Sequence, residues 1–167
     1  MKTNQCVLSC TADGRIVEMN ALELFNLLKD ADEYVTTLKG VGTQAAYYLR
    51  LASVCESTRN YGQALSMLRK ALALYCRHDL AAMTQHYVHA AKSCARRIDR
   101  LRHKAFGGSH TPGVAGDVTA FYTELYWLRL LDEKPQVWDL YCEQGLIPPI
   151  DSAQWQLICQ QLTQYGH

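Results

Sequence analysis

The fold is decided by residues 47–75, which read YYLRLASVCESTRNYGQALSMLRKALALY. Apolar and small side chains recur in this stretch every three or four residues, which places them along one face of a helix. The pair Arg59-Asn60 interrupts the pattern, so the stretch predicts two helices joined by a tight turn. The facing positions are Tyr48, Leu51, Ala52 and Cys55 on the first helix, and Ala64, Leu68 and Ala71 on the second. The alanines let the two backbones approach closely, while the larger side chains fill the space around them.

This hairpin, over residues 45–76, resembles a tetratricopeptide repeat, which is a helix–turn–helix unit of about 34 residues. The positions that match the pattern of the family are Tyr48, Leu51, Ala52, Tyr61, Ala64, Leu68 and Ala71. The sequence departs from the pattern at Cys55, where an aromatic residue is usual, and at Cys76, where proline is usual. The resemblance implies a helical unit that binds a peptide or helix of another protein. An ordinary helical hairpin is the alternative interpretation of the same spacing.

A second repeat does not follow at the expected distance. It would need a leucine and a small residue near Gln85 and His86, and neither occurs there. One repeat cannot bury its own hydrophobic face, so it needs other elements to pack against. We therefore expect an irregular helical bundle or a short α-solenoid-like domain rather than a regular array.

The chain before the hairpin predicts one small sheet and two short helices. Asp13-Gly14 suits a tight turn between the two short apolar runs of residues 7–19, so a β-hairpin is expected there. Asn20 and Glu23 form a capping-box pattern, which predicts a helix over residues 21–29. A second short helix fits residues 30–38, and Thr43 is the expected N-cap of the helix that follows.

The chain after the hairpin predicts further helices. Asp79 is the expected N-cap of one long helix, whose apolar positions are Leu80, Met83, Tyr87, Ala90, Cys94, Ile98, Leu101 and Ala105. Asp117 is the expected N-cap of a helix that ends before Pro135, and shorter helices follow Pro135 and Asp151. We expect a core over residues 1–106, a flexible glycine-rich linker over 107–116, and C-terminal helices over 117–167 that pack on the core.

Length and composition indicate a globular chain. Its 167 residues can bury a core without metal or disulfides, and its formal net charge of +1 gives no overall field that attracts nucleic acid. The seven cysteines are an odd number and lie mostly on apolar faces, which is typical of reduced core residues. We see neither the basic-then-apolar pattern expected of a leader nor an apolar run of about 18 residues. We therefore expect a cytoplasmic protein without a membrane-spanning segment.

Positive charge is concentrated on one stretch of the expected long helix. Lys92, Arg96, Arg100 and Lys104 recur every four residues, and Arg97 lies beside them. Such a stripe can neutralise phosphates of DNA or RNA, or meet an acidic partner. The solvated face of an amphipathic helix accounts for the same pattern.

Residues 60–97 also resemble, at fewer positions, the PerC-type transcriptional activators. The matching positions are Tyr61, Ala64, Leu68, Asp79 and Cys94. This second resemblance implies a regulator of transcription that binds nucleic acid.

Motifs for catalysis or metal binding are weak. His86, His89 and Cys94 could begin a zinc site, but no second pair of ligands follows at a suitable spacing. Lys39 precedes Gly40-Val41-Gly42, whereas a phosphate-binding loop places its lysine after the glycines. We therefore expect no enzyme activity, no metal and no cofactor.

The sequence thus predicts a protein-binding module of adaptor, chaperone-like or regulatory type. The candidate partner-binding residues are Tyr48, Arg50, Ser53 and Arg69. The alternative is a nucleic-acid-binding regulator that uses Lys92, Arg96, Arg97, Arg100 and Lys104. Self-association stays open, and so does the question of whether the aromatic stretch 121–127 belongs to the core or to an interface.

Overall fold

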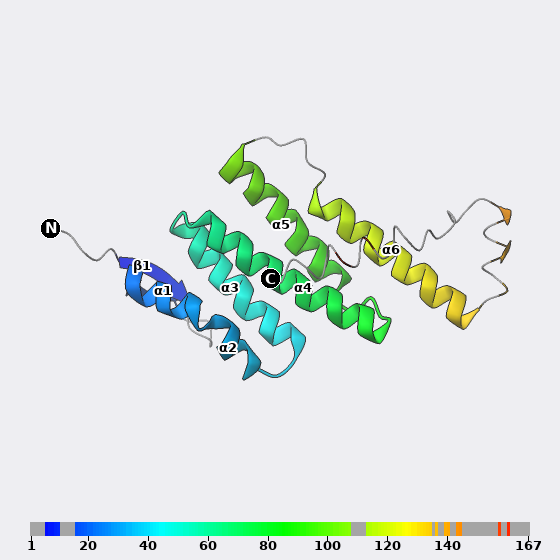
Figure 1. The fold of residues 1–167 in the computed structure, drawn as a ribbon, viewed down its shortest axis with the longest axis horizontal. Helices are drawn as coiled ribbons and strands as arrows, with labels where there is room; N and C mark the ends of the chain where they lie inside the picture. The colour runs from blue at the N-terminus through cyan, green and yellow to red at the C-terminus, as the bar shows by residue number, and fades with distance from the viewer. Residues whose placement is uncertain are drawn as a thin grey trace.

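The computed structural model describes residues 6–10, 16–107, 113–134, 136, 139–140, 143–144, 157 and 160. Within these ranges the elements are β1 (Cys6–Cys10), β2 (Ile16–Asn20), α1 (Ala21–Lys29), α2 (Ala31–Thr36), α3 (Val41–Ser57), α4 (Tyr61–Ala82), α5 (Val88–Phe106) and α6 (Val114–Glu133). The predicted fold class, mainly α, is confirmed. Helices α3 to α6 lie side by side, each antiparallel to the one before it, while α2 contacts α3 and α1 contacts α2 and the two strands (Figure 1). No helix in the described part of the chain is both long and apolar enough to cross a membrane.

The short strands β1 and β2 pair antiparallel, with Cys6 opposite Asn20 and Cys10 opposite Ile16. They lie where the sequence predicts a hairpin, while the expected turn at Asp13-Gly14 is outside the described residues. The next helix, α1, has the bounds expected from the capping pattern at its start.

The core lies between α3, α4, α5 and α6, and each of these helices buries the same spacing of side chains. Buried residues recur at positions i, i+3, i+4 and i+7, which is the stripe of a helix that packs on one side. They are Tyr48, Leu51, Ala52 and Cys55 on α3; Ala64, Met67, Leu68 and Ala71 on α4; Ala91, Cys94, Ala95 and Ile98 on α5; and Val118, Phe121, Tyr122 and Leu125 on α6. The hairpin predicted from residues 47–75 is therefore followed by a second helical hairpin, α5–α6, which begins later than a regular repeat would.

The single long helix expected from Asp79 to Ala105 is wrong. The chain leaves the helix at Met83, whose φ of 52° is left-handed, and α5 begins only at Val88. Thr84 N–H donates to the Asp79 carbonyl at 3.0 Å and so closes the end of α4. The apolar spacing continues in register across this turn, and the turn has neither glycine nor proline. The sequence pattern therefore predicts a continuous helix here.

Asp79 is not a helix N-cap but a fully buried acceptor near the end of α4. Its carboxylate accepts hydrogen bonds from Thr84 Oγ1 at 2.9 Å, from the Tyr87 backbone N–H at 2.9 Å and from Tyr122 Oη at 2.7 Å. These donors belong to the α4–α5 turn, to the residue that precedes α5, and to α6. Burial, the neighbouring Cys76 thiol and this hydrogen bond raise the pKa of Tyr122 far above its ordinary value. One carboxylate therefore ties together three consecutive helices.

Asp99 has the corresponding role one helix later. Its two oxygens accept from Val114 N–H at 2.7 Å and from Ala115 N–H at 2.9 Å, so a side chain of α5 caps the first turn of α6. Gly113 allows this approach, because a Cβ there would lie 2.7 Å from Asp99 Oδ2. Helix α6 thus begins before Asp117, the expected N-cap, and inside the expected linker at 107–116. The domain division itself stays a prediction, and the helices expected after Pro135 lie almost wholly outside the described residues.

Candidate partner-binding face

Two hollows lie along α5, and both are lined by basic side chains. The first, which we name the α3–α5 pocket, has a volume of about 250 Å³ and is lined by Glu56, Arg97, Arg100, Leu101 and Lys104. The second, the α5 hollow, has a volume of about 460 Å³ and is lined by Ser93, Arg96, Asp99 and Arg100. Arg100 lines both, so the two hollows adjoin along α5, and together we call them the basic face.

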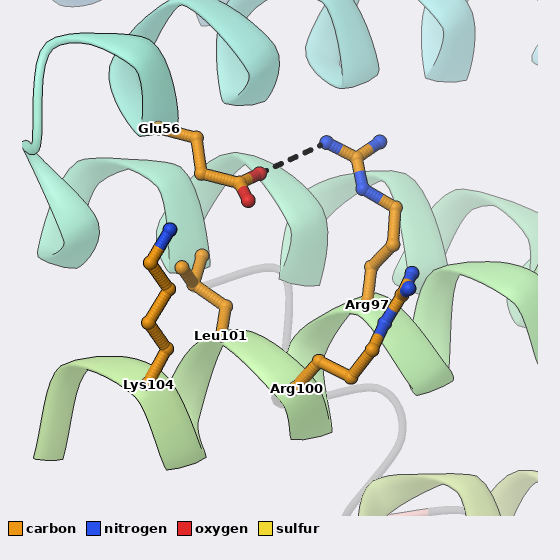
Figure 2. A pocket seen from close by; sticks show the side chains of 5 residues that line it. All are labelled: Glu56, Arg97, Arg100, Leu101 and Lys104. Carbon is orange, nitrogen blue, oxygen red and sulfur yellow. Dashed lines mark hydrogen bonds and ion pairs between the residues drawn. The ribbon is translucent and has the colours of Figure 1, made fainter. Parts of the chain in front are cut away.

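The packing order of the helices creates this face. Helices α3 and α5 both pack on α4 and run in the same direction, so the last turns of α3 lie opposite the second half of α5. Figure 2 shows Glu56 reaching from α3 into the space between Lys104 and Arg97 of α5, with Arg100 extending from α5 on the side of Arg97 away from Glu56. Leu101, only 3% exposed, provides an apolar floor between them.

Arg97 joins the two helices through long contacts. Its Nη2 atom lies 3.4 Å from Glu56 Oε2 and 3.4 Å from Ser53 Oγ. Good charge-assisted hydrogen bonds are shorter, about 2.7–2.9 Å. The two side chains are also partly exposed, at 26% for Arg97 and 36% for Glu56. A pair of this kind contributes about 0–1 kcal/mol, so an incoming group can replace it at little cost.

The other charged side chains on the basic face differ in whether they have a partner. The Lys104 ammonium lies 5.6 Å from the centre of the Tyr61 ring, within the range of a cation–π contact. Asp99 is acidic, but both of its oxygens already accept hydrogen bonds from the start of α6. Among the residues that the structure describes, neither Arg96 nor Arg100 forms an ion pair. The face therefore has a surplus of positive charge.

The residues predicted for nucleic-acid binding are brought together on α5. Arg97, Arg100 and Lys104 line the α3–α5 pocket, and Arg96 lines the α5 hollow. Lys92 lies one turn before Arg96 on the same helix and is half-buried. Four of the five predicted residues thus line the two hollows, and Glu56 and Leu101, which the sequence did not indicate, line the α3–α5 pocket with them.

The four residues predicted for partner binding differ in their exposure. Tyr48 is 6% exposed and belongs to the core, where its hydroxyl donates to Asp32 Oδ1 at 2.7 Å. Burial and this hydrogen bond raise the pKa of Tyr48 far above its ordinary value. Ser53 is exposed and lies beside Arg97, whereas Arg50 and Arg69 are half-buried. Ser53 is thus the member of this set that contributes to the basic face.

The cysteines and histidines form no comparable site within the described ranges. Burial raises the pKa of Cys55 to about 11 and that of Cys94 to about 12, so both thiols stay protonated and unreactive at neutral pH. The exposed His86 ring packs edge-on against Tyr87, with 4.6 Å between ring centres. No group of three metal-ligating side chains is present among the described residues.

Chemically, the basic face is suited to binding anions. Guanidinium groups offer planar, paired donors that match carboxylates and phosphates. The supporting side chains come from helices rather than loops, so their spacing is fixed by the packing of α3 and α5 on α4. No protein-family model matches the chain, and comparisons with curated proteins and with solved structures find no match either.

Proposed function

We propose that the protein is a non-enzymatic protein-binding module, an adaptor or regulator that receives a segment of another protein on its basic face. The observation that supports this most directly is the α3–α5 pocket. It combines charged walls from two helices with the apolar floor of Leu101. Protein partners are bound by this combination, because polar groups select the ligand while apolar contacts add affinity.

Nucleic-acid binding is the second candidate, since six lysines and arginines lie within about three and a half turns of one helix, from Lys92 to Lys104. Two features favour the protein-binding proposal over it. Glu56 brings a negative charge into the middle of the face, and the Tyr61 ring is already covered by Lys104. The large exposed aromatic side chains among the described residues, Phe25, Tyr34 and Tyr126, lie on α1, α2 and α6. Stacking of bases on α5 would therefore lack an exposed aromatic platform.

Site-directed photo-crosslinking tests the proposal. Ser53 is replaced by p-benzoylphenylalanine in the full chain, and Arg129 on α6 is replaced in the same way as a control. We expect a partner to be cross-linked from the Ser53 position and not from the Arg129 position. The identified partner is then purified, and its binding is measured to the double variant Arg96→Glu/Arg100→Glu. A second copy of the chain is one of the partners that this experiment can report.

The matched control is Lys39→Glu, which reverses an exposed charge in the α2–α3 connection, at the opposite end of α3 from Glu56. We expect the double variant to weaken binding at least about tenfold and Lys39→Glu to leave it unchanged. Equal cross-linking from both positions, or unchanged affinity of the double variant, would contradict the proposal. Retention of the wild type on double-stranded DNA that falls steeply with salt and is lost in the double variant would instead support the second candidate.

A further inference from the structure

We infer that the basic face recognises an acidic peptide segment, and that Glu56 acts as an internal competitor for the same cationic site. This inference rests on the proposed function and names the chemistry of its partner. Its starting point is the Glu56 carboxylate, which already projects into the α3–α5 pocket and lies 3.4 Å from Arg97 (Figure 2). The carboxylate of Glu56 therefore occupies a place that an acidic side chain of a partner could take.

The balance of charge indicates that this internal carboxylate does not saturate the site. Three cations line the α3–α5 pocket, namely Arg97, Arg100 and Lys104, and Glu56 is the acidic side chain that lines it with them. In the α5 hollow, Arg96 and Arg100 accompany Asp99, whose oxygens are occupied by the backbone of α6. Within the described ranges, Arg96 and Arg100 are thus available to a ligand with more than one negative charge.

The spacing of these two arginines fits a peptide. Arg96 and Arg100 are one helical turn apart, about 6 Å along the axis of α5. Side chains on the same face of an extended peptide are about 6.6–6.8 Å apart, so acidic residues at alternate positions could reach both arginines. The apolar Leu101 floor lies beside them and could accept the aliphatic part of such a peptide.

If Glu56 is a competitor, its replacement should raise the affinity for the ligand. A residue that merely supports the fold weakens binding when it is altered, whereas removal of a competitor strengthens it. Glu56→Gln keeps the size of the side chain and removes its charge, which releases Arg97 and removes repulsion of an acidic ligand. From the strength of exposed ion pairs we expect the affinity for an acidic peptide to increase about two- to fivefold.

The experiment is a fluorescence anisotropy titration of the full chain. The probe is a short fluorescein-labelled peptide of alternating Glu and Ala, and the control peptide has Gln in place of Glu. The variants are Glu56→Gln, the double variant Arg96→Gln/Arg100→Gln, and Lys39→Gln as a surface control. Unchanged circular dichroism spectra and melting temperatures establish that each variant is folded.

We expect the Glu peptide to bind more tightly than the Gln peptide, Glu56→Gln to increase its affinity, and the double arginine variant to reduce it at least about tenfold. Unchanged or weakened binding by Glu56→Gln would overturn the inference, as would equal binding of the two peptides. Tighter binding of single-stranded oligothymidine of equal charge would overturn it in favour of a phosphate ligand. If binding of a purified partner depends on Arg96 and Arg100 but is not strengthened by Glu56→Gln, the proposed function survives and this inference fails.

Discussion

Replacement of Asp79 by alanine tests the role that the structure gives to its buried carboxylate. The change removes the acceptor of three hydrogen bonds, from Thr84 Oγ1, the Tyr87 backbone N–H and Tyr122 Oη, and also the 3.3 Å contact with His78 Nδ1. Water can reach the first two, because Thr84 and Tyr87 are only half-buried, but Tyr122 is 3% exposed. An unsatisfied buried donor costs about 1–3 kcal/mol, and part of the total is offset because a buried charge is removed as well.

The expected decrease in the free energy of unfolding for Asp79→Ala is therefore about 1–3 kcal/mol. For a chain of this size that corresponds to a melting temperature lower by about 2–12 °C. Asp79→Asn keeps the shape and one acceptor, so about half of this loss is expected. Urea unfolding followed by circular dichroism measures the change, and the exposed Asp132→Ala on α6 is the control, with an expected effect within about 0.5 kcal/mol.

A double-mutant cycle with Tyr122→Phe isolates the contact between α4 and α6. The 2.7 Å hydrogen bond predicts that the two single changes are not additive, with a coupling free energy of about 1–2 kcal/mol. Loss of less than about 1 kcal/mol in Asp79→Ala would refute the reasoning, and so would additivity within about 0.5 kcal/mol.

Three other predictions concern the second hairpin. Asp99→Ala should lower the free energy of unfolding by about 1–2 kcal/mol and speed hydrogen exchange at the Val114 amide. Adding Gly113→Ala to this variant should cause no further loss, because the clash at 2.7 Å disappears with the carboxylate. Burial raises the pKa of Cys94 to about 12, so iodoacetamide should label this thiol only in urea, and mass spectrometry that finds native labelling would contradict its burial. Burial also raises the pKa of Glu124, whose Oε2 has no hydrogen-bond partner within the described ranges. The folded state therefore holds this proton more tightly, and the carboxyl lowers stability once the pH exceeds its ordinary pKa of about 4.3. Glu124→Gln should consequently stabilise the protein at pH 7 relative to the wild type, with a gain that disappears below that pKa, and a gain that is independent of pH would contradict this account.

Local signals were enough to predict the first hairpin. The turn at Arg59-Asn60 interrupts the apolar spacing on both sides, so the bounds of α3 and α4 near it follow from the sequence alone. The second turn has no such signal, because the apolar spacing continues through it, although Met83, like Arg59 in the first turn, is left-handed without being glycine. The apolar positions on both sides of it fit one continuous stripe, which is why a single helix was expected.

The two wrongly expected N-caps have a different cause, which is that aspartate side chains bind groups far away in the sequence. Asp79 and Asp117 both precede apolar runs, as N-caps do, but Asp79 binds groups from three parts of the chain and Asp117 lies inside the first turn of α6. The basic residues of the candidate site were predictable, because they belong to one helix. Their pairing with Glu56 was not, because it depends on where α5 begins relative to α3.

The hydrogen bond from Tyr122 to Asp79 has a consequence for how the molecule unfolds. In a linear array whose units contact only their neighbours, the terminal unit can melt while the remainder stays folded. Here α6 is anchored directly to α4, past the helix between them, so opening of the last hairpin also removes a partner from the first. We expect one cooperative transition, with coincident curves from circular dichroism and from tyrosine fluorescence, and not a progressive loss of helices from the C-terminal side.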